Sequence, residues 1–203
     1  MIINIHDICE NGNSELYKWL KANAGGEIYS PDLEYGRYDP RATFERLSSR
    51  RNMYEKLAKG KDDPVRVVAS GYGGFFGHML HIVRYQMQTI LIDPLLIPFA
   101  PMRLHSSYSG REAMARLMTD GFFEWEYGFG ANLHVICTAG RDGRAYEEQI
   151  RCVLPDGFKN YYRVKSAGDL GGETGEILKK LLNEPPVRIE YIDQTDVIPG
   201  WED

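Results

Sequence analysis

The sequence predicts an α/β fold, a three-layer α/β/α sandwich in which a mostly parallel β-sheet is covered by helices on both faces. β-rich runs alternate with segments of helical periodicity along most of the chain, as they do in proteins built on parallel sheets. The clearest case is residues 65–93, which read as strand, glycine-rich turn, helix and strand. The chain has 203 residues, enough to bury a core, and we expect one domain over residues 1–203.

The N-terminal part of the chain supplies the first elements of this pattern. Either Asn13 or Ser14 can cap the first helix, because the oxygen of a short side chain accepts a hydrogen bond from a free backbone N–H group in the first turn of the helix. Pro40 suits the first turn of the second helix, where its missing N–H is not needed. The expected elements are a strand over 2–5, a helix over 15–23, a strand over 27–29 and a helix that starts at Pro40.

The central unit is a buried strand that enters a helix through a tight turn. Val65, Val67 and Val68 form an apolar run that ends in glycines, as a buried parallel strand does. The turn over residues 69–74 opens a helix with apolar residues at helical spacing, and a β-rich run over 89–93 follows. These features together predict a βαβ unit.

The second half of the chain continues the alternation. After two prolines, residues 187–192 alternate like a half-exposed strand, so residues 187–203 are expected to add an extra C-terminal strand and tail. The other expected elements are a helix over 109–119, an extended aromatic stretch over 122–129, a strand over 133–138, a helix over 146–153, a strand over 161–164 and a helix over 173–182.

Composition and charge exclude several classes of partner. The net charge of −5 argues against binding to nucleic acid or to an acidic membrane surface. No apolar run approaches membrane-spanning length, and the N-terminal sequence lacks the features of a secretory signal, so the cytoplasm is the expected location. The three cysteines have no CxxC spacing, and Cys137 lies in an apolar strand as a core residue. No cofactor and no metal are predicted.

Short motifs along the chain resemble those of the short bacterial α/β-hydrolases, a small esterase-like family. Each motif is weak alone, but their joint order is moderately specific and covers most of residues 1–183. The resemblance implies an α/β-hydrolase type of fold. The motifs are His6 after the first strand, Tyr29-Ser30-Pro31, Gly73-Gly74 followed by Phe75-Phe76, Asp93-Pro94 with Pro98-Phe99, Tyr108-Ser109-Gly110, Thr138 to Asp142, and Gly168-Asp169.

The resemblance implies a degenerate catalytic triad. The turn of a nucleophile elbow presents a serine, and Gly71 stands at that position. Asp142 stands at the position of the acid, and Leu170 stands where the family has histidine. Asp7 also departs from the family, which usually has glycine after the histidine of the first loop. Glycine enters positive φ without a steric clash, so we expect Gly71 to have a positive φ.

Other side chains offer substitutes or plainer roles. Ser70 is either a replacement nucleophile or a hydrogen-bonded hydroxyl at the end of a strand, and His6 is either a replacement base or structural. His78 and His81, at i and i+3, are either metal ligands or, as two surface histidines, ordinary polar positions. Tyr72 is expected to project into the cleft. The residues expected to line this ligand-binding cleft are His6, Asp7, Ser70, Gly71, Tyr72 and Asp142.

Three functions follow from this interpretation. In the first, the protein has lost serine-hydrolase activity and binds an unidentified small molecule or protein in the former active site. In the second, it is an active hydrolase of a small ester, with a substituted nucleophile such as Ser70. In the third, it is a homodimeric structural or interaction protein that pairs through a strand over residues 187–192.

Overall fold

A single sheet of parallel strands organises the protein, as the sequence predicts. The computed structural model describes residues 1–35, 40–48, 65–83, 87–97, 130–141, 143–154 and 158–188. The described strands are all parallel and lie in the order β2-β1-β3-β4-β5-β6. They are β1 (Ile2–Ile5), β2 (Ile28–Tyr29), β3 (Arg66–Ser70), β4 (Gln88–Ile92), β5 (Leu133–Thr138) and β6 (Tyr161–Val164).

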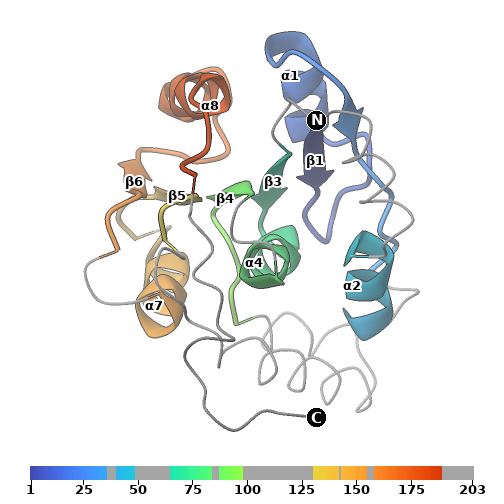
Figure 1. Ribbon diagram of the computed structural model, residues 1–203. Helices are drawn as coiled ribbons and strands as arrows, with labels where there is room; N and C mark the ends of the chain where they lie inside the picture. The colour runs from blue at the N-terminus through green and yellow to red at the C-terminus, as the bar shows by residue number, and fades with distance from the viewer. Residues whose placement is uncertain are drawn as a thin grey trace, which may run out of the picture.

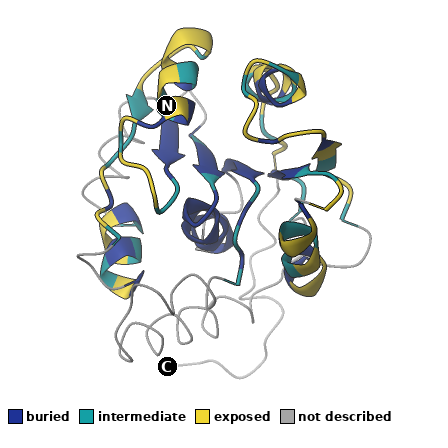
Figure 2. Cartoon of the chain, turned by 180° about the vertical axis from the view of Figure 1, so that it is seen from behind, coloured by how far each residue is buried: buried dark blue, intermediate teal, exposed yellow. Residues whose placement is uncertain are grey.

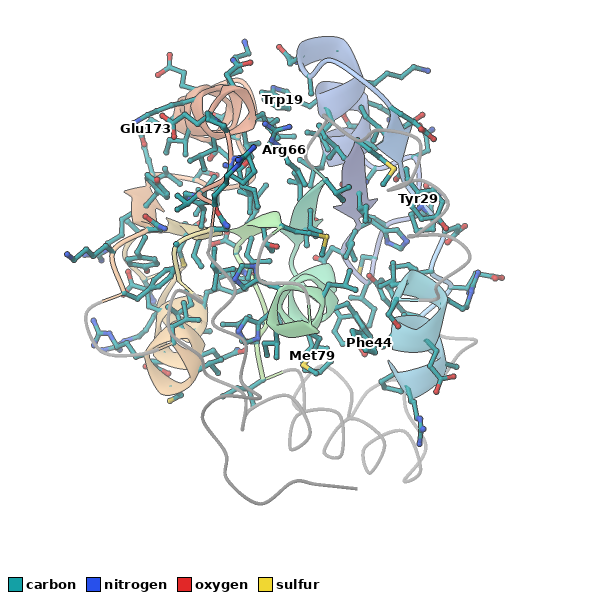
Figure 3. All side chains as sticks on the ribbon, viewed as in Figure 1. Trp19, Tyr29, Phe44, Arg66, Met79 and Glu173 are labelled. Carbon is teal, nitrogen blue, oxygen red and sulfur yellow. The ribbon has the colours of Figure 1, made fainter. Side chains whose placement is uncertain are left out.

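Helices cover both faces of the sheet and give the expected three layers. The described helices are α1 (Glu15–Asn23), α2 (Pro40–Ser48), α4 (Gly73–Val83), α7 (Arg144–Val153) and α8 (Glu173–Asn183). α1 and α8 lie on one face, and α2, α4 and α7 lie on the other (Figure 1). Trp19 of α1 and Glu173 of α8 mark the first layer, and Phe44 of α2 and Met79 of α4 mark the second (Figure 3).

The hydrophobic core is divided by the sheet into two clusters. Val67 and Ala69 of β3 belong to the cluster beneath α4, whereas Val68 belongs to the cluster beneath α1 and α8. This division follows from the strand itself, because successive side chains of a strand point to opposite faces. The odd and even positions of β1 divide in the same way, with Ile3 and Ile5 on the α4 face and Ile2 on the other.

Helix α4 is the central helix and packs very closely on the sheet. It is buried on every side whose residues are described, whereas α1, α7 and α8 show exposed outer faces (Figure 2). Two of its glycines permit this approach. A Cβ atom at Gly73 would lie 2.5 Å from the carbonyl oxygen of His6, and one at Gly77 would lie 2.8 Å from the Cβ of Ala69.

Most element boundaries agree with the sequence-based expectations. Ser14 caps α1, and its Oγ accepts a hydrogen bond from the backbone N–H of Tyr17 at 3.2 Å. Helix α2 begins at Pro40, as expected. Helix α7 begins at Arg144, two residues before the predicted start, and α8 ends at Asn183, one residue later than predicted. Such shifts are ordinary because terminal turns of helices are the least well specified.

Polar side chains at the amino ends of three strands hold the last turn of α8 and the segment that follows it. Arg66 donates to the carbonyl oxygen of Glu184 at 3.2 Å and lies near α8 (Figure 3). Gln88 donates to the carbonyl of Leu181 at 3.0 Å. The side chain of Asn132 bonds to both the N–H and the C=O of Val187, at 2.7 and 2.9 Å. Residues 187 and 188 lie outside any strand.

Several expected features lie outside the described residues. These are the helix over 109–119, the aromatic stretch over 122–129, residues 189–192 of the C-terminal strand, and Asp142. Across the ranges that are described, no helix is both long and apolar enough to cross a membrane.

The two histidines of α4 are buried, so the expectation that they lie on the surface is wrong. His78 is 2% exposed and His81 is 0% exposed. Nδ1 of His81 lies 3.1 Å from Oγ1 of Thr89 on β4. The apolar periodicity of this helix placed both histidines outside the apolar stripe, but neighbouring elements enclose the whole helix. Cys137, expected in the core, is fully buried.

Candidate functional site

The candidate site lies where the order of the strands reverses. The chain passes from β1 outward to β2, then returns to β3 on the other side of β1 and continues outward to β4. In open parallel sheets, ligands bind at the carboxyl ends of the two strands that flank such a reversal. Here those ends carry His6 and Asp7 after β1, and Ser70 and Gly71 at the end of β3.

The turn after β3 has the backbone of a nucleophile elbow. Gly71 has φ +52°, which confirms the positive φ predicted from the sequence. Its N–H donates to the carbonyl of Ile92 at 3.0 Å, and its own carbonyl accepts from Leu95 N at 2.9 Å and from Gly74 N at 3.0 Å. The turn is therefore held on β4 and on the loop that follows β4.

The carboxylate of Asp7 occupies the site next to this turn. Oδ1 of Asp7 accepts a hydrogen bond from the backbone N–H of Ile8 at 2.7 Å and another from the N–H of Tyr72 at 2.7 Å. In active α/β-hydrolases, the N–H that follows the nucleophile and an N–H from the loop after an earlier strand form the oxyanion hole. Tyr72 follows Gly71 and Ile8 lies in the loop after β1, and both of their N–H groups are bonded to Asp7.

Asp7 and a side chain at position 71 exclude each other. A Cβ atom built on Gly71 would collide with Cγ, Oδ1 and Oδ2 of Asp7. The carboxylate therefore stands where the side chain of an elbow nucleophile would begin. The sequence shows both departures, at Asp7 and at Gly71, but only the structure shows that this position of the Asp7 carboxylate requires glycine at position 71.

His6 is fixed by hydrogen bonds on both ring nitrogens. Nε2 accepts from the backbone N–H of Leu33 at 3.1 Å, so Nδ1 carries the proton and donates to the carbonyl oxygen of Asp7 at 2.7 Å. The ring is 1% exposed. These contacts tie the loop after β1 to the loop after β2, and they leave neither nitrogen available to act as a base.

Tyr72 lies in an aromatic cluster of the core, away from the cleft position expected for it. Its ring packs edge-to-face against Tyr35 and Phe76, with centroid distances of 4.9 and 5.6 Å. Tyr72 is 4% exposed, and burial raises the pKa of its hydroxyl to about 12. Burial also raises the pKa of Tyr35, which donates to the carbonyl of His6 at 2.7 Å. Both phenols are therefore neutral near pH 7.

Ser70 ends β3 and faces the layer of α1 and α8. It is two residues after Val68, which packs in the cluster on that face. Its Oγ is shielded from solvent and has no hydrogen-bond partner within the described residues. The expectation of a strand-terminal hydroxyl is confirmed, but the partner expected for it is not found there.

The remaining triad positions do not supply a base in the described chain. Leu170 lies in the loop between β6 and α8 and packs, partly buried, against the cluster on the α1–α8 face. Asp142 belongs to the residues that are not described. Over the described ranges, no group of three or more His, Cys, Asp or Glu side chains is placed to hold a metal ion.

Asp93 is a feature of the site that sequence analysis did not single out as functional. It has φ +42°, a conformation uncommon for a non-glycine residue. Its carboxylate accepts from the N–H and the hydroxyl of Thr138 at 2.7 and 2.6 Å, and the same hydroxyl accepts from Ala167 N at 2.9 Å. This chain of bonds ties together the carboxyl ends of β4, β5 and β6. The Asp93-Pro94 pair was the signal that could have revealed it.

Comparisons with known proteins agree with this geometry at the level of the fold. No protein-family model and no curated protein sequence matches the chain. An esterase of Pyrococcus furiosus is similar in structure, with a TM-score of 0.54 and 12% identity over 89% of this chain and 81% of the esterase. The protein TT1662 from Thermus thermophilus is similar with a TM-score of 0.54 and 13% identity over 90% and 89% of the two chains. The chain has the α/β-hydrolase fold.

Proposed function

We propose that this protein is an α/β-hydrolase homologue that has lost serine-hydrolase activity and binds a small molecule or a protein at the carboxyl edge of its sheet. The observation that carries the proposal is the position of Asp7. Its carboxylate receives both N–H groups that would stabilise an oxyanion, and it stands where the nucleophile would be. The backbone of the elbow is retained, but its N–H donors bind the carboxylate of Asp7 in place of a substrate oxyanion.

The loss of activity follows from three separate deficits. Gly71 has no side chain to attack a substrate, and Leu170 cannot accept a proton. The two N–H donors already hold an anion, and removal of even one oxyanion-hole donor slows acyl transfer by roughly 10²–10³-fold in known enzymes. Each deficit alone is severe, and together they support a binding role.

A fluorophosphonate probe and a short-chain p-nitrophenyl ester test the loss of activity. We expect no covalent labelling and no turnover above that of buffer. Gly71→Ser is also expected to be inactive, because Leu170 stands at the position of the base. Labelling of the unmodified protein, or ester turnover by Gly71→Ser, would contradict the proposal.

An active hydrolase that uses Ser70 is the alternative, and the geometry weighs against it. The Ser70 hydroxyl is shielded from solvent, and both ring nitrogens of His6 are engaged. The fluorophosphonate probe distinguishes the inactive homologue from a hydrolase that uses Ser70. Ser70→Ala is the test variant, and Ser166→Ala, which changes an exposed serine, is its control. Labelling that disappears in Ser70→Ala alone would favour the alternative.

The binding role has its own test by NMR. Backbone amide shifts are followed while a set of small-molecule fragments, including acetate and short-chain alcohols, is added. We expect the shifts to change most at Asp7, Ile8, Gly71 and Tyr72, the residues that surround the elbow. Changes confined to amides elsewhere in the protein would contradict a binding site at this edge.

We also propose that the protein forms a homodimer through residues 187–192 and that it is located in the cytoplasm. Val187 is 55% exposed, the largest such exposure of a bulky apolar side chain within the described residues, and it begins the segment expected to pair. Size-exclusion chromatography with light scattering compares the full chain with a form truncated after Pro186. A monomeric mass for both forms would exclude dimerisation through this segment.

A further inference from the structure

Two polar side chains on neighbouring strands each keep a buried atom without a partner among the described residues. They are Oδ1 of Asn4 on β1 and Oγ of Ser70 on β3. Asn4 is 0% exposed. We propose that an internal water molecule binds between these two atoms and links β1 to the strand that carries the elbow.

The orientation of the Asn4 amide follows from its neighbours. The hydroxyl of Ser30 donates to the carbonyl of Gly12 at 2.6 Å, so its oxygen can only accept from Asn4. Nδ2 of Asn4 therefore faces Ser30, at 2.8 Å, and lies 3.5 Å from Oγ of Ser14. Oδ1 is the atom that remains, and it is an acceptor that needs a donor.

Strand register places Ser70 on the same side of the sheet as Asn4. Asn4 pairs with Val68, two residues before Ser70 on the adjacent parallel strand. Residues two apart on one strand share a face, and Val68 packs on the α1–α8 face. Strand spacing and rise put the Cα atoms of Asn4 and Ser70 about 8 Å apart, a diagonal that short polar side chains can bridge through one water.

A water molecule satisfies both atoms in a way that the two side chains alone do not. One O–H of the water donates to Oδ1 of Asn4, and its oxygen accepts the hydroxyl proton of Ser70. The water oxygen has a second lone pair for the hydroxyl proton of Ser14, whose own oxygen already accepts from Tyr17 N and Asn4 Nδ2. Buried waters commonly make two to four such bonds to polar groups, and a buried polar atom without a hydrogen-bond partner destabilises the fold.

This site gives the Ser70 hydroxyl a structural role whether or not the protein turns over a substrate. The water would join the two strands that flank the reversal in the sheet, directly before the residues that form the elbow. The Ser70 hydroxyl would point toward the α1–α8 face of the sheet and donate its hydrogen bond to the water. The water would belong to the framework of the site, and its presence does not depend on the proposed loss of activity.

The test is detection of a long-lived water by NMR in the full chain. Cross-relaxation between water and the side-chain amide protons of Asn4 is measured in the unmodified protein, in Ser70→Ala and in Ser166→Ala, whose serine is exposed. We expect a signal from a water with a residence time longer than molecular tumbling in the unmodified protein and in Ser166→Ala, and its loss in Ser70→Ala. Absence of the signal from the unmodified protein, or its persistence in Ser70→Ala, would overturn the proposal.

A high-resolution crystal structure of the unmodified protein provides a second reading that does not depend on a variant. Density for a water within about 3.2 Å of both Asn4 Oδ1 and Ser70 Oγ supports the inference. A direct hydrogen bond between the two side chains, or another side chain bonded to them in place of water, would overturn it.

Discussion

The carboxylate of Asp7 lies in the space that a side chain on Gly71 would need. Oδ1 of Asp7 is bonded to the N–H of Tyr72 at 2.7 Å, and a Cβ atom at position 71 would overlap the carboxylate. Positions 7 and 71, far apart in the sequence, thus form one structural feature. Glycine at position 71 provides the room, and aspartate at position 7 uses the hydrogen-bond donors.

Gly71→Ser is expected to lower the free energy of unfolding by more than Gly140→Ser. Both glycines have positive φ, +52° and +82°, so serine at either one incurs backbone strain of roughly 1–3 kcal/mol. Only Gly71 faces a carboxylate, whereas a Cβ atom at Gly140 meets nothing within 4 Å. We expect an additional loss of roughly 1–3 kcal/mol for the displaced neighbour. Urea denaturation measures both, and equal losses would contradict the contact with Asp7.

Asp7→Ala is expected to destabilise the protein by about 1–3 kcal/mol, because it leaves the N–H groups of Ile8 and Tyr72 without their acceptor. Asp7→Asn retains an acceptor oxygen, so its loss should be smaller. Glu148→Ala is the control, since that side chain is 71% exposed and its ion pair with Arg144 is long, at 3.7 Å. Urea midpoints that are equal for Asp7→Ala and Glu148→Ala would show that the carboxylate contributes little.

Acidification is expected to destabilise the protein through His78. Burial, together with the nearby His81, lowers its pKa from 6.5 to about 3. Between these two values the unfolded chain binds a proton that the folded chain does not, so stability is full above pH 6.5 and falls as the pH decreases toward 3. The slope should reach about 1.4 kcal/mol per pH unit for this one group. Urea unfolding from pH 7.5 to 4.5 should show a shallower slope for His78→Gln, and an unchanged slope would contradict the assignment.

Thr138→Val is expected to destabilise the protein by roughly 1–3 kcal/mol. The change removes the donor to the carboxylate of Asp93 and the acceptor for Ala167 N, while the side chain keeps its shape. Asn tolerates positive φ, so Asp93→Asn is the matched partner for a double-mutant cycle. The losses of unfolding free energy in the two single variants should sum to more than the loss in the double variant, because each single variant removes part of the same contact. Strict additivity would show that Asp93 and Thr138 act independently.

The sequence alone determined the layout of the fold. Alternating strand and helix patterns depend on residues that are close in the chain, so their periods can be identified directly. The same holds for the caps, for the glycines of the elbow and for the positive φ of Gly71, because a sharp turn restricts the local backbone. The resemblance to α/β-hydrolases rested on such local motifs, and the type of fold that it implied is confirmed.

The tertiary structure decided how the site is occupied. Asp7 and Tyr72 are 65 residues apart, and only the parallel pairing of β1 with β3 brings them together. The burial of His78 and His81 likewise depends on elements that enclose α4 from several directions, which no periodicity within the helix encodes. Local patterns specify strands, helices and turns, whereas the register between strands determines which side chains meet at the strand ends. In this protein the register brings the Asp7 carboxylate to the N–H of Tyr72, at the turn after β3.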